Sequence, residues 1–166
     1  MGGEELFVSI LAVTVRAGTS LLYATVGEIF TERSGVLNLG LEGMMIMGAV
    51  TGFATAFHTG SLLAGVLVAM LVGGLLGLIH AFLAVTLQAD QVVAGLGLTI
   101  LGTSMANFLG RLLGPGGQPL GGQIGPKFTR LTIPGLVEIP LLGEALFHQD
   151  LLVYLMYLLV PLAWLY

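Results

Sequence analysis

Residues 27–43 read Gly-Glu-Ile-Phe-Thr-Glu-Arg-Ser-Gly-Val-Leu-Asn-Leu-Gly-Leu-Glu-Gly and separate two long apolar runs. The stretch gathers charges and glycines, namely Glu28, Glu32, Arg33 and Glu42 together with Gly27, Gly35, Gly40 and Gly43. Charges cost several kcal/mol in hydrocarbon, so these side chains are expected at an interface, in a cavity or against a partner. Glycines let a backbone bend or approach a neighbour closely. We therefore predict that residues 27–43 form a loop that breaks and re-enters a membrane domain.

The composition indicates a membrane protein. Apolar residues make up 56% of the chain, charged residues only 8%, and the mean hydropathy is +1.02. About a quarter of the residues in a soluble domain are charged, so a soluble fold of this length could not cover its surface. The sequence therefore predicts an all-α, polytopic integral membrane helical bundle. The net charge of −4 offers no basic surface for nucleic acid, and the lack of cysteine excludes disulfides and thiol chemistry.

Five apolar runs are candidates for the helices of this bundle: residues 6–27, 44–57, 62–87, 92–109 and 151–166. Arg16 interrupts the first run and leaves two interpretations open. In the favoured one, its side chain snorkels from a shorter or tilted helix. In the other, a half-helix begins near Ala17 and residues 1–15 lie along the interface.

The run 62–87 carries a small residue at every fourth position: Gly65, Ala69, Gly73, Gly77 and Ala81. In lipid, such a stripe lets another helix pack backbone to backbone, so we predict that these residues serve helix packing. His80, near the end of the run, is expected to be a histidine with satisfied hydrogen bonds at an interface rather than a ligand.

Residues 111–150 are expected to form an extramembrane connection, because glycine and proline recur through them and break helices. The last run, 151–166, is shorter than the roughly twenty residues that a stable span needs. It also ends without a flanking charge. We therefore expect the chain to be cut within this helix.

The motifs of common catalytic sites are missing from the sequence. There is no phosphate-binding loop of the Gly-x-x-x-x-Gly-Lys type and no His-Glu-x-x-His, and the three histidines lie far apart. We expect neither an enzyme nor a metal site. Glu28 and Glu32 are four residues apart and could carry protons or bind a cation. We favour the alternative of an exposed helix end that Arg33 partly neutralises.

Two segments resemble a known family. Residues 32–45, Glu-Arg-Ser-Gly-Val-Leu-Asn-Leu-Gly-Leu-Glu-Gly-Met-Met, with Gly48-Ala49, resemble the signature region of ABC importer permeases for branched-chain amino acids, simple sugars and nucleosides. Residues 87–96, Leu-Gln-Ala-Asp-Gln-Val-Val-Ala-Gly-Leu, are similar to a segment that opens a later helix in those permeases. The similarity is strongest to nucleoside or simple-sugar permeases that work with basic-membrane-protein-type binding lipoproteins.

The resemblance implies that residues 1–166 are a single transmembrane permease domain, the N-terminal half of the ABC importer permease fold. It implies a multi-pass protein of the cell (inner) membrane that moves nucleosides or simple sugars. The implied partners are membrane lipid, a second permease subunit, an extracytoplasmic solute-binding lipoprotein and cytoplasmic ATPase subunits. ATP would bind those ATPase subunits, so this chain is expected to carry no cofactor. The segment that contacts the ATPase would follow residue 166.

By the same resemblance, residues 31–42 and 88–91 would be cytoplasmic and residues 111–150 outside. Arg111, Lys127 and Arg130 argue for the reverse orientation under the positive-inside rule, and we follow the family. The resemblance also implies polar residues along the substrate path: Asn38, Glu42, Gln91, Thr99, Thr103 and Asn107. For Asn38 and Glu42 the alternative is capping of the next helix, which we favour for Asn38. For the polar side chains of the run 92–109 the alternative is a hydrogen bond to a neighbouring helix, which is the commoner role in membrane helices.

An ion- or proton-coupled secondary transporter is the alternative function. It would need acidic residues in the middle of the membrane and an inverted repeat. Glu28, Glu32, Glu42 and Asp90 all fall near the ends of the apolar runs, which counts against it.

Overall fold

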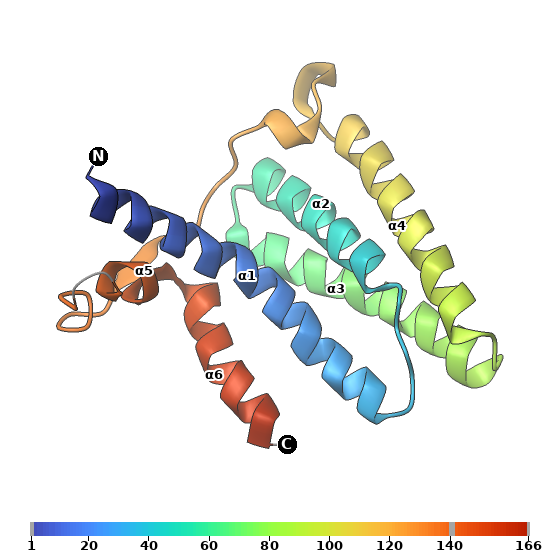
Figure 1. The fold of residues 1–166 in the computed structure, drawn as a ribbon. Helices are drawn as coiled ribbons and strands as arrows, with labels where there is room; N and C mark the ends of the chain where they lie inside the picture. Colours follow the sequence, from blue (N-terminus) through green and yellow to red (C-terminus); the bar gives the residue numbers. More distant parts are fainter. Residues whose placement is uncertain (1, 140–141, 166) are drawn as a thin grey trace. The chain divides into compact units, whose positions relative to one another are not determined.

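The computed structural model describes residues 2–139 and 142–165, and nearly all of the regular structure in them is helical (Figure 1). The long helices are α1 (Gly3–Arg33), α2 (Leu41–Thr59), α3 (Leu62–Ala81), α4 (Gln91–Leu112) and α6 (Leu151–Leu165). A π-helical turn, η1 (Phe82–Thr86), continues α3. Shorter elements follow α4, namely the 3-10 turns η2 (Pro115–Gly117) and η3 (Leu120–Gly122), β1 (Arg130–Thr132), α5 (Gly143–Phe147) and β2 (His148–Asp150).

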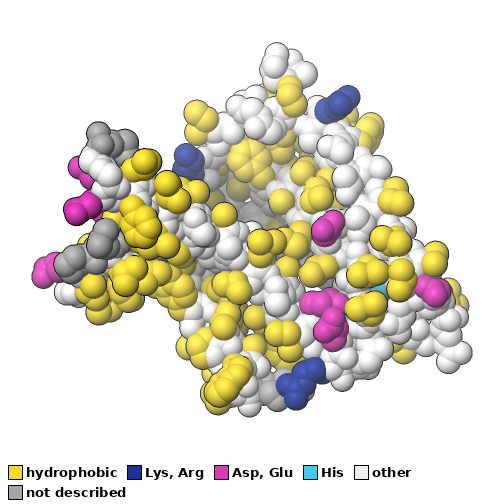
Figure 2. Space-filling view, viewed as in Figure 1, with side chains coloured by type: hydrophobic (Ala, Val, Ile, Leu, Met, Phe, Trp, Pro, Cys, Tyr) yellow, Lys and Arg dark blue, Asp and Glu magenta, His cyan; other side chains and the backbone are white. Residues whose placement is uncertain are grey.

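The helices have the length and composition of membrane spans. Within the described residues, three helices are long and apolar enough to cross a bilayer: Gly3–Arg33, Leu62–Thr86 and Gln91–Leu112. In the most apolar window of each, at most 22% of the residues are buried inside the protein, so most of these side chains face outward. Figure 2 shows apolar side chains spread over the visible surface. An outward-facing apolar surface is what lipid requires, and the predicted helical membrane protein is confirmed.

The chain divides into two compact units, which we describe separately. The terminal unit comprises Met1–Gly27 and Phe128–Tyr166, and the central unit comprises Glu28–Lys127.

In the central unit, α2 packs against both α3 and α4, and two pairs of glycines set these contacts. A Cβ atom on Gly102 of α4 would lie 2.7 Å from the Cα atom of Gly43 in α2. A Cβ atom on Gly65 of α3 would lie 2.7 Å from the carbonyl oxygen of Gly52 in α2. Both distances are far below ordinary van der Waals contact, so side chains at these positions would push the helices apart. The three helices therefore pack backbone to backbone, as small residues allow in membranes.

In the terminal unit, hydrogen bonds from polar side chains join α1 to β2 and to the start of α6. Gln149, only 1% exposed, donates hydrogen bonds from its amide nitrogen to the carbonyl oxygens of Ala145 and Ala12. The Tyr23 hydroxyl donates to the carbonyl oxygen of Leu152 over 2.8 Å. Strands β1 and β2 pair antiparallel, with Arg130 opposite Asp150. Oδ1 of Asp150 accepts hydrogen bonds from the first turn of α6 and so caps that helix.

One prediction about the first third of the chain is wrong, and one alternative is excluded. The loop is confined to residues 34–40, because residues 28–33 continue α1 without a break and α2 already begins at Leu41. Charges at a helix end do not stop the helix, and Gly27 keeps helical geometry. The half-helix beginning near Ala17 is also absent: α1 runs unbroken through Arg16, whose Nε donates to the carbonyl oxygen of Ala12.

Candidate functional site

Several polar side chains of the central unit gather around the loop of residues 34–40. The loop begins where α1 ends in a Schellman motif, with the amide of Val36 donating to the carbonyl of Thr31 and that of Gly35 to Glu32. Gly35 takes a φ of 84°, a left-handed conformation that glycine adopts without strain. This glycine therefore ends the helix and turns the chain toward α2.

Two side chains of α4 hold the loop backbone. Oε1 of Gln91 accepts a 2.8 Å hydrogen bond from the amide of Leu37, and its Nε2 donates to the carbonyl of Gly35 at 3.4 Å. The hydroxyl of Thr99 donates to the carbonyl of Leu39 over 2.8 Å. These bonds satisfy loop groups that no helix or strand would otherwise satisfy.

One peptide unit of the loop is held from both sides. The amide of Asn38 donates to Oε1 of Glu28 over 2.9 Å, and the carbonyl of Leu37 lies 3.0 Å from Nε2 of His80. Both groups belong to the peptide bond that joins residues 37 and 38. Because a carbonyl oxygen can only accept, Nε2 of His80 must carry the hydrogen. Glu28 Oε2 and His80 Nδ1 are buried without a hydrogen-bond partner among the described residues.

Asn38 shapes the turn that precedes α2. Its side chain is 8% exposed, and its Oδ1 accepts a 3.0 Å hydrogen bond from the amide of Gly40. Its Nδ2 faces the sulfur of Met44 at 3.7 Å. The N-cap residue of α2 is Gly40, which makes no side-chain capping bond. The prediction that Asn38 caps the helix is therefore wrong, because Asn38 lies two residues before the capping position.

The loop can lie against α4 because Gly95 has no side chain. A Cβ atom at Gly95 would come within 2.9 Å of the backbone nitrogen of Leu39 and 3.0 Å of that of Gly40. Any larger residue would lift the loop from the helix and stretch the bonds to Gln91 and Thr99. The glycine and the two polar side chains therefore act together, one turn apart on α4.

The structure brings some of the predicted path residues together and leaves others apart. Asn38, Gln91 and Thr99 meet at the loop, where their side chains bond backbone groups or a buried sulfur. Glu42 is exposed in the first turn of α2. Farther along α4, Thr103 is half-buried and Asn107 is exposed. The side chains of this second group are therefore not engaged by the loop.

Two residues that bond the loop, Glu28 and His80, were missed or misjudged from the sequence. Glu28 is half-buried and binds the loop backbone, so the prediction of an exposed helix end is wrong for it, whereas Glu32 is exposed. His80 is 2% exposed, and among the described residues only one of its ring nitrogens has a hydrogen-bond partner. A lone histidine in an otherwise apolar run was the signal, but its partner lies 43 residues earlier in the chain.

The small-residue stripe of α3 divides into two halves. Gly65 and Ala69 face α2, where added atoms at Gly52 would meet them within 3.0 Å. Nothing lies within 4 Å of a Cβ atom built at Gly73 or Gly77, and Ala81 is exposed. Only the first half of the stripe therefore packs within the central unit.

These features define a class of protein. The helices present apolar surfaces for lipid, and several polar side chains bond the backbone of the loop. Among the described residues, no group of three or more His, Cys, Asp or Glu side chains could hold a metal ion. This is the organisation of a membrane-embedded helical protein in which polar side chains hold a loop between helices.

A comparison with known protein families agrees with a helical membrane protein and identifies the family. A model of the family described as "Branched-chain amino acid transport system / permease component" matches residues 9–165, nearly the whole chain. The protein therefore belongs to this permease family, and the resemblance seen in the two sequence motifs is confirmed. No solved structure matches the chain.

Curated relatives come from archaea and bacteria. The permease TsgC13 of Haloferax volcanii, which its name assigns provisionally to a glucose ABC transporter, is 41% identical over 159 residues, covering 93% of this chain and 46% of the relative. The guanosine ABC transporter permease NupQ of Bacillus subtilis is 35% identical, covering 86% and 47%. The nucleoside ABC transporter permease NupC of Lactococcus lactis is 33% identical, covering 88% and 47%. The chain thus spans about half the length of these relatives.

Proposed function

We propose that this protein is a permease subunit of an ABC importer that moves nucleosides or simple sugars across the cell's inner membrane. The match of residues 9–165 to the permease family carries the proposal. The named solutes of the relatives, glucose, guanosine and nucleosides, give the substrate class. All are hydroxyl-rich and neutral, so side chains that donate or accept hydrogen bonds, carboxylates included, suit them.

The proposal includes partners that hydrolyse ATP and deliver the solute. The chain has no phosphate-binding loop, so ATP would bind cytoplasmic ATPase subunits and the permease itself would catalyse no reaction. A second permease would complete the pathway, and an extracytoplasmic lipoprotein would supply the solute. Residues 31–42 and 88–91 would then face the cytoplasm.

For the substrate path, we propose Glu42, Thr103 and Asn107 as the contacts with solute. The side chains of Asn38, Gln91 and Thr99 are engaged by the loop or its neighbours, which favours a positioning role for them. Thr103 and Asn107 are one turn apart on α4 and make no hydrogen bond through their side chains within the described part of the chain. Weak bonds from such groups suit a permease, because tight binding would slow release.

Transport in proteoliposomes tests the function. The assembled permeases and ATPases would be reconstituted with ATP inside, the binding lipoprotein outside, and radiolabelled guanosine or glucose as the solute. We expect uptake that requires ATP, the ATPase and the binding protein. A matched vesicle with an ATPase that binds but does not hydrolyse ATP is the control.

Uptake driven by a proton gradient without ATP would contradict the proposal and favour the secondary transporter. The path residues are tested in the same assay. Thr103→Val and Asn107→Ala should each lower the apparent affinity for solute, whereas Ser104→Ala on an exposed position of α4 should not. If all three substitutions change the apparent affinity equally, Thr103 and Asn107 are not solute contacts.

A further inference from the structure

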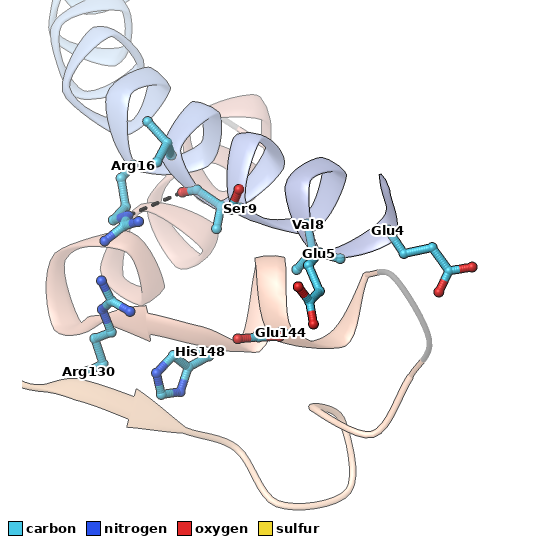
Figure 3. Close-up of a pocket in the computed structure, with 10 residues that line it drawn as sticks. Glu4, Glu5, Val8, Ser9, Arg16, Arg130, Glu144 and His148 are labelled. Atoms are coloured by element: carbon cyan, nitrogen blue, oxygen red, sulfur yellow. Dashed lines mark hydrogen bonds between the residues drawn. The ribbon is translucent and has the colours of Figure 1, made fainter. Parts of the chain in front are cut away.

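The terminal unit holds a groove that is separate from the loop of the central unit. It has a volume of about 850 Å³ and lies between the first half of α1 and the segment that contains β1, α5 and β2 (Figure 3). Charged and titratable side chains dominate its lining: Glu4, Glu5, Arg16, Arg130, Glu144 and His148. Such a concentration of charge is unusual in a chain with only 8% charged residues.

The positive groups of the groove converge. Figure 3 shows the guanidinium groups of Arg16 and Arg130 turned toward each other from α1 and β1. Neither forms an ion pair within residues 2–139 and 142–165, although Arg16 donates from Nε to the carbonyl of Ala12. Two facing guanidinium groups repel each other, and an anion between them would convert that repulsion into attraction. Guanidinium groups bind phosphate through two parallel hydrogen bonds, so phosphate is the anion that this geometry suits best.

The negative groups lie at the other end. Figure 3 places the carboxylates of Glu5 and Glu144 away from the two arginines, along the same groove. Oε2 of Glu5 already accepts a hydrogen bond from the amide of Gly2 over 3.2 Å. A simple anion would be repelled by this end. A ligand with a phosphate at one end and an amine at the other would match both the arginine end and the carboxylate end of the groove.

The setting of the groove points to a lipid. Charged groups are too costly for the hydrocarbon core, so the groove belongs at the level of the lipid headgroups. Val8, Ala12 and Val13 also line it, and the neighbouring side chains of Leu6, Phe7 and Ile10 are exposed on α1. These apolar groups would contact acyl chains, which a soluble phosphate lacks.

We propose that the groove binds the headgroup of a zwitterionic phospholipid of the phosphoethanolamine type. Arg16 and Arg130 hold the phosphodiester, and Glu5 and Glu144 receive the ammonium group. His148 is tied through Nδ1 to the hydroxyl of Thr132 at 2.9 Å, which fixes its ring at the wall of the groove. The site depends only on the membrane class of the protein and not on the solute that it transports.

Binding of short-chain lipids to the assembled, delipidated transporter tests the site. The probes are dihexanoyl phosphatidylethanolamine, dihexanoyl phosphatidylglycerol and the soluble headgroup glycerophosphoethanolamine. Arg130→Ala should weaken phosphatidylethanolamine binding about tenfold, the loss of one charge-assisted bidentate contact. Lys127→Ala removes an exposed positive charge that does not line the groove, and it should change the affinity little.

The negative end has its own pair of variants. Glu144→Gln should weaken binding of the ethanolamine lipid about threefold and leave the glycerol lipid unweakened, because only the former carries an ammonium group. Glu138→Gln, at an exposed carboxylate outside the groove, is the control. Arg130→Lys keeps the charge and should bind the lipid better than Arg130→Ala. This comparison separates the loss of charge from a general folding defect.

Three results would overturn the proposal. Equal losses from Arg130→Ala and Lys127→Ala would mean that the effect is general electrostatics. Equal affinity for phosphatidylethanolamine and phosphatidylglycerol would show that the groove makes no contact with the ammonium group. Equal affinity for the soluble headgroup and its lipid would assign the groove to a soluble phosphate ester.

Discussion

The contact of α2 with α4 offers a sharp test of the packing, through the substitution Gly102→Ala. The added methyl group would lie 2.5 Å from the carbonyl oxygen of Gly43 and 2.7 Å from its Cα atom, whereas ordinary contact begins at 3.4 Å. The helices would have to separate by about 0.7–0.9 Å, an overpacking that typically costs about 1–3 kcal/mol. We therefore expect Gly102→Ala to lower the free energy of unfolding by about 2 kcal/mol.

Gly97→Ala is the matched control for this experiment. Gly97 lies on the same helix, but nothing is within 4 Å of a Cβ atom built there. Both substitutions gain the same helix propensity, so the difference between their unfolding free energies reports the contact with α2. Steric trapping in bicelles would measure the unfolding free energy of each variant. Equal stabilities for the two variants would refute the backbone-to-backbone packing of α2 and α4.

Three further predictions concern the loop and the orientation of the chain. Gln91→Leu removes both bonds to the loop, so amide hydrogen exchange at Leu37 should become faster, while Gln91→Glu, which keeps the acceptor for Leu37, should have a smaller effect. Exchange at Leu37 that is unchanged in Gln91→Leu would contradict this role. His80→Leu leaves the carbonyl of Leu37 without a donor and should lower the unfolding free energy by about 1–3 kcal/mol. His80→Gln can present a donor near the same place and should recover part of that loss; equal losses would exclude the hydrogen bond as the cause. The chain has no cysteine, so single cysteines at Gln88 and Gln123 can report orientation. A membrane-impermeant maleimide should label position 88 only from the cytoplasm and position 123 only from outside, and the reverse pattern would overturn the proposed orientation.

Composition and periodicity were enough to predict the class of fold. The run 62–87 is a helix from Leu62 to Ala81 continued by η1, and the run 92–109 lies within α4. These predictions succeeded because an apolar stretch in lipid must satisfy its backbone internally, and a helix does so with local bonds alone. The motif at residues 32–45 also identified the family before any contact was known.

The details of the loop could not be predicted, because they depend on partners far apart in the sequence. His80 reaches Leu37 across 43 residues, and Gln91 reaches the same residue across 54. The family resemblance suggested Gln91 and Thr99 as solute contacts, but a loop without regular structure needs donors and acceptors first. The charges of residues 28–33 looked like a break in the helix, yet the chain turns only at Gly35, where the backbone becomes left-handed.

The loop of residues 34–40 also constrains how the central unit can move. Side chains from α1, α3 and α4 each bond it through Glu28, His80, Gln91 and Thr99. If α4 slid by one helical turn along its axis, about 5.4 Å, the 2.8 Å bonds from Gln91 and Thr99 would both break. The hydrogen bonds to the loop therefore oppose sliding of these helices past one another. Any motion of these helices must either carry the central unit as one block or break the hydrogen bonds of the loop together.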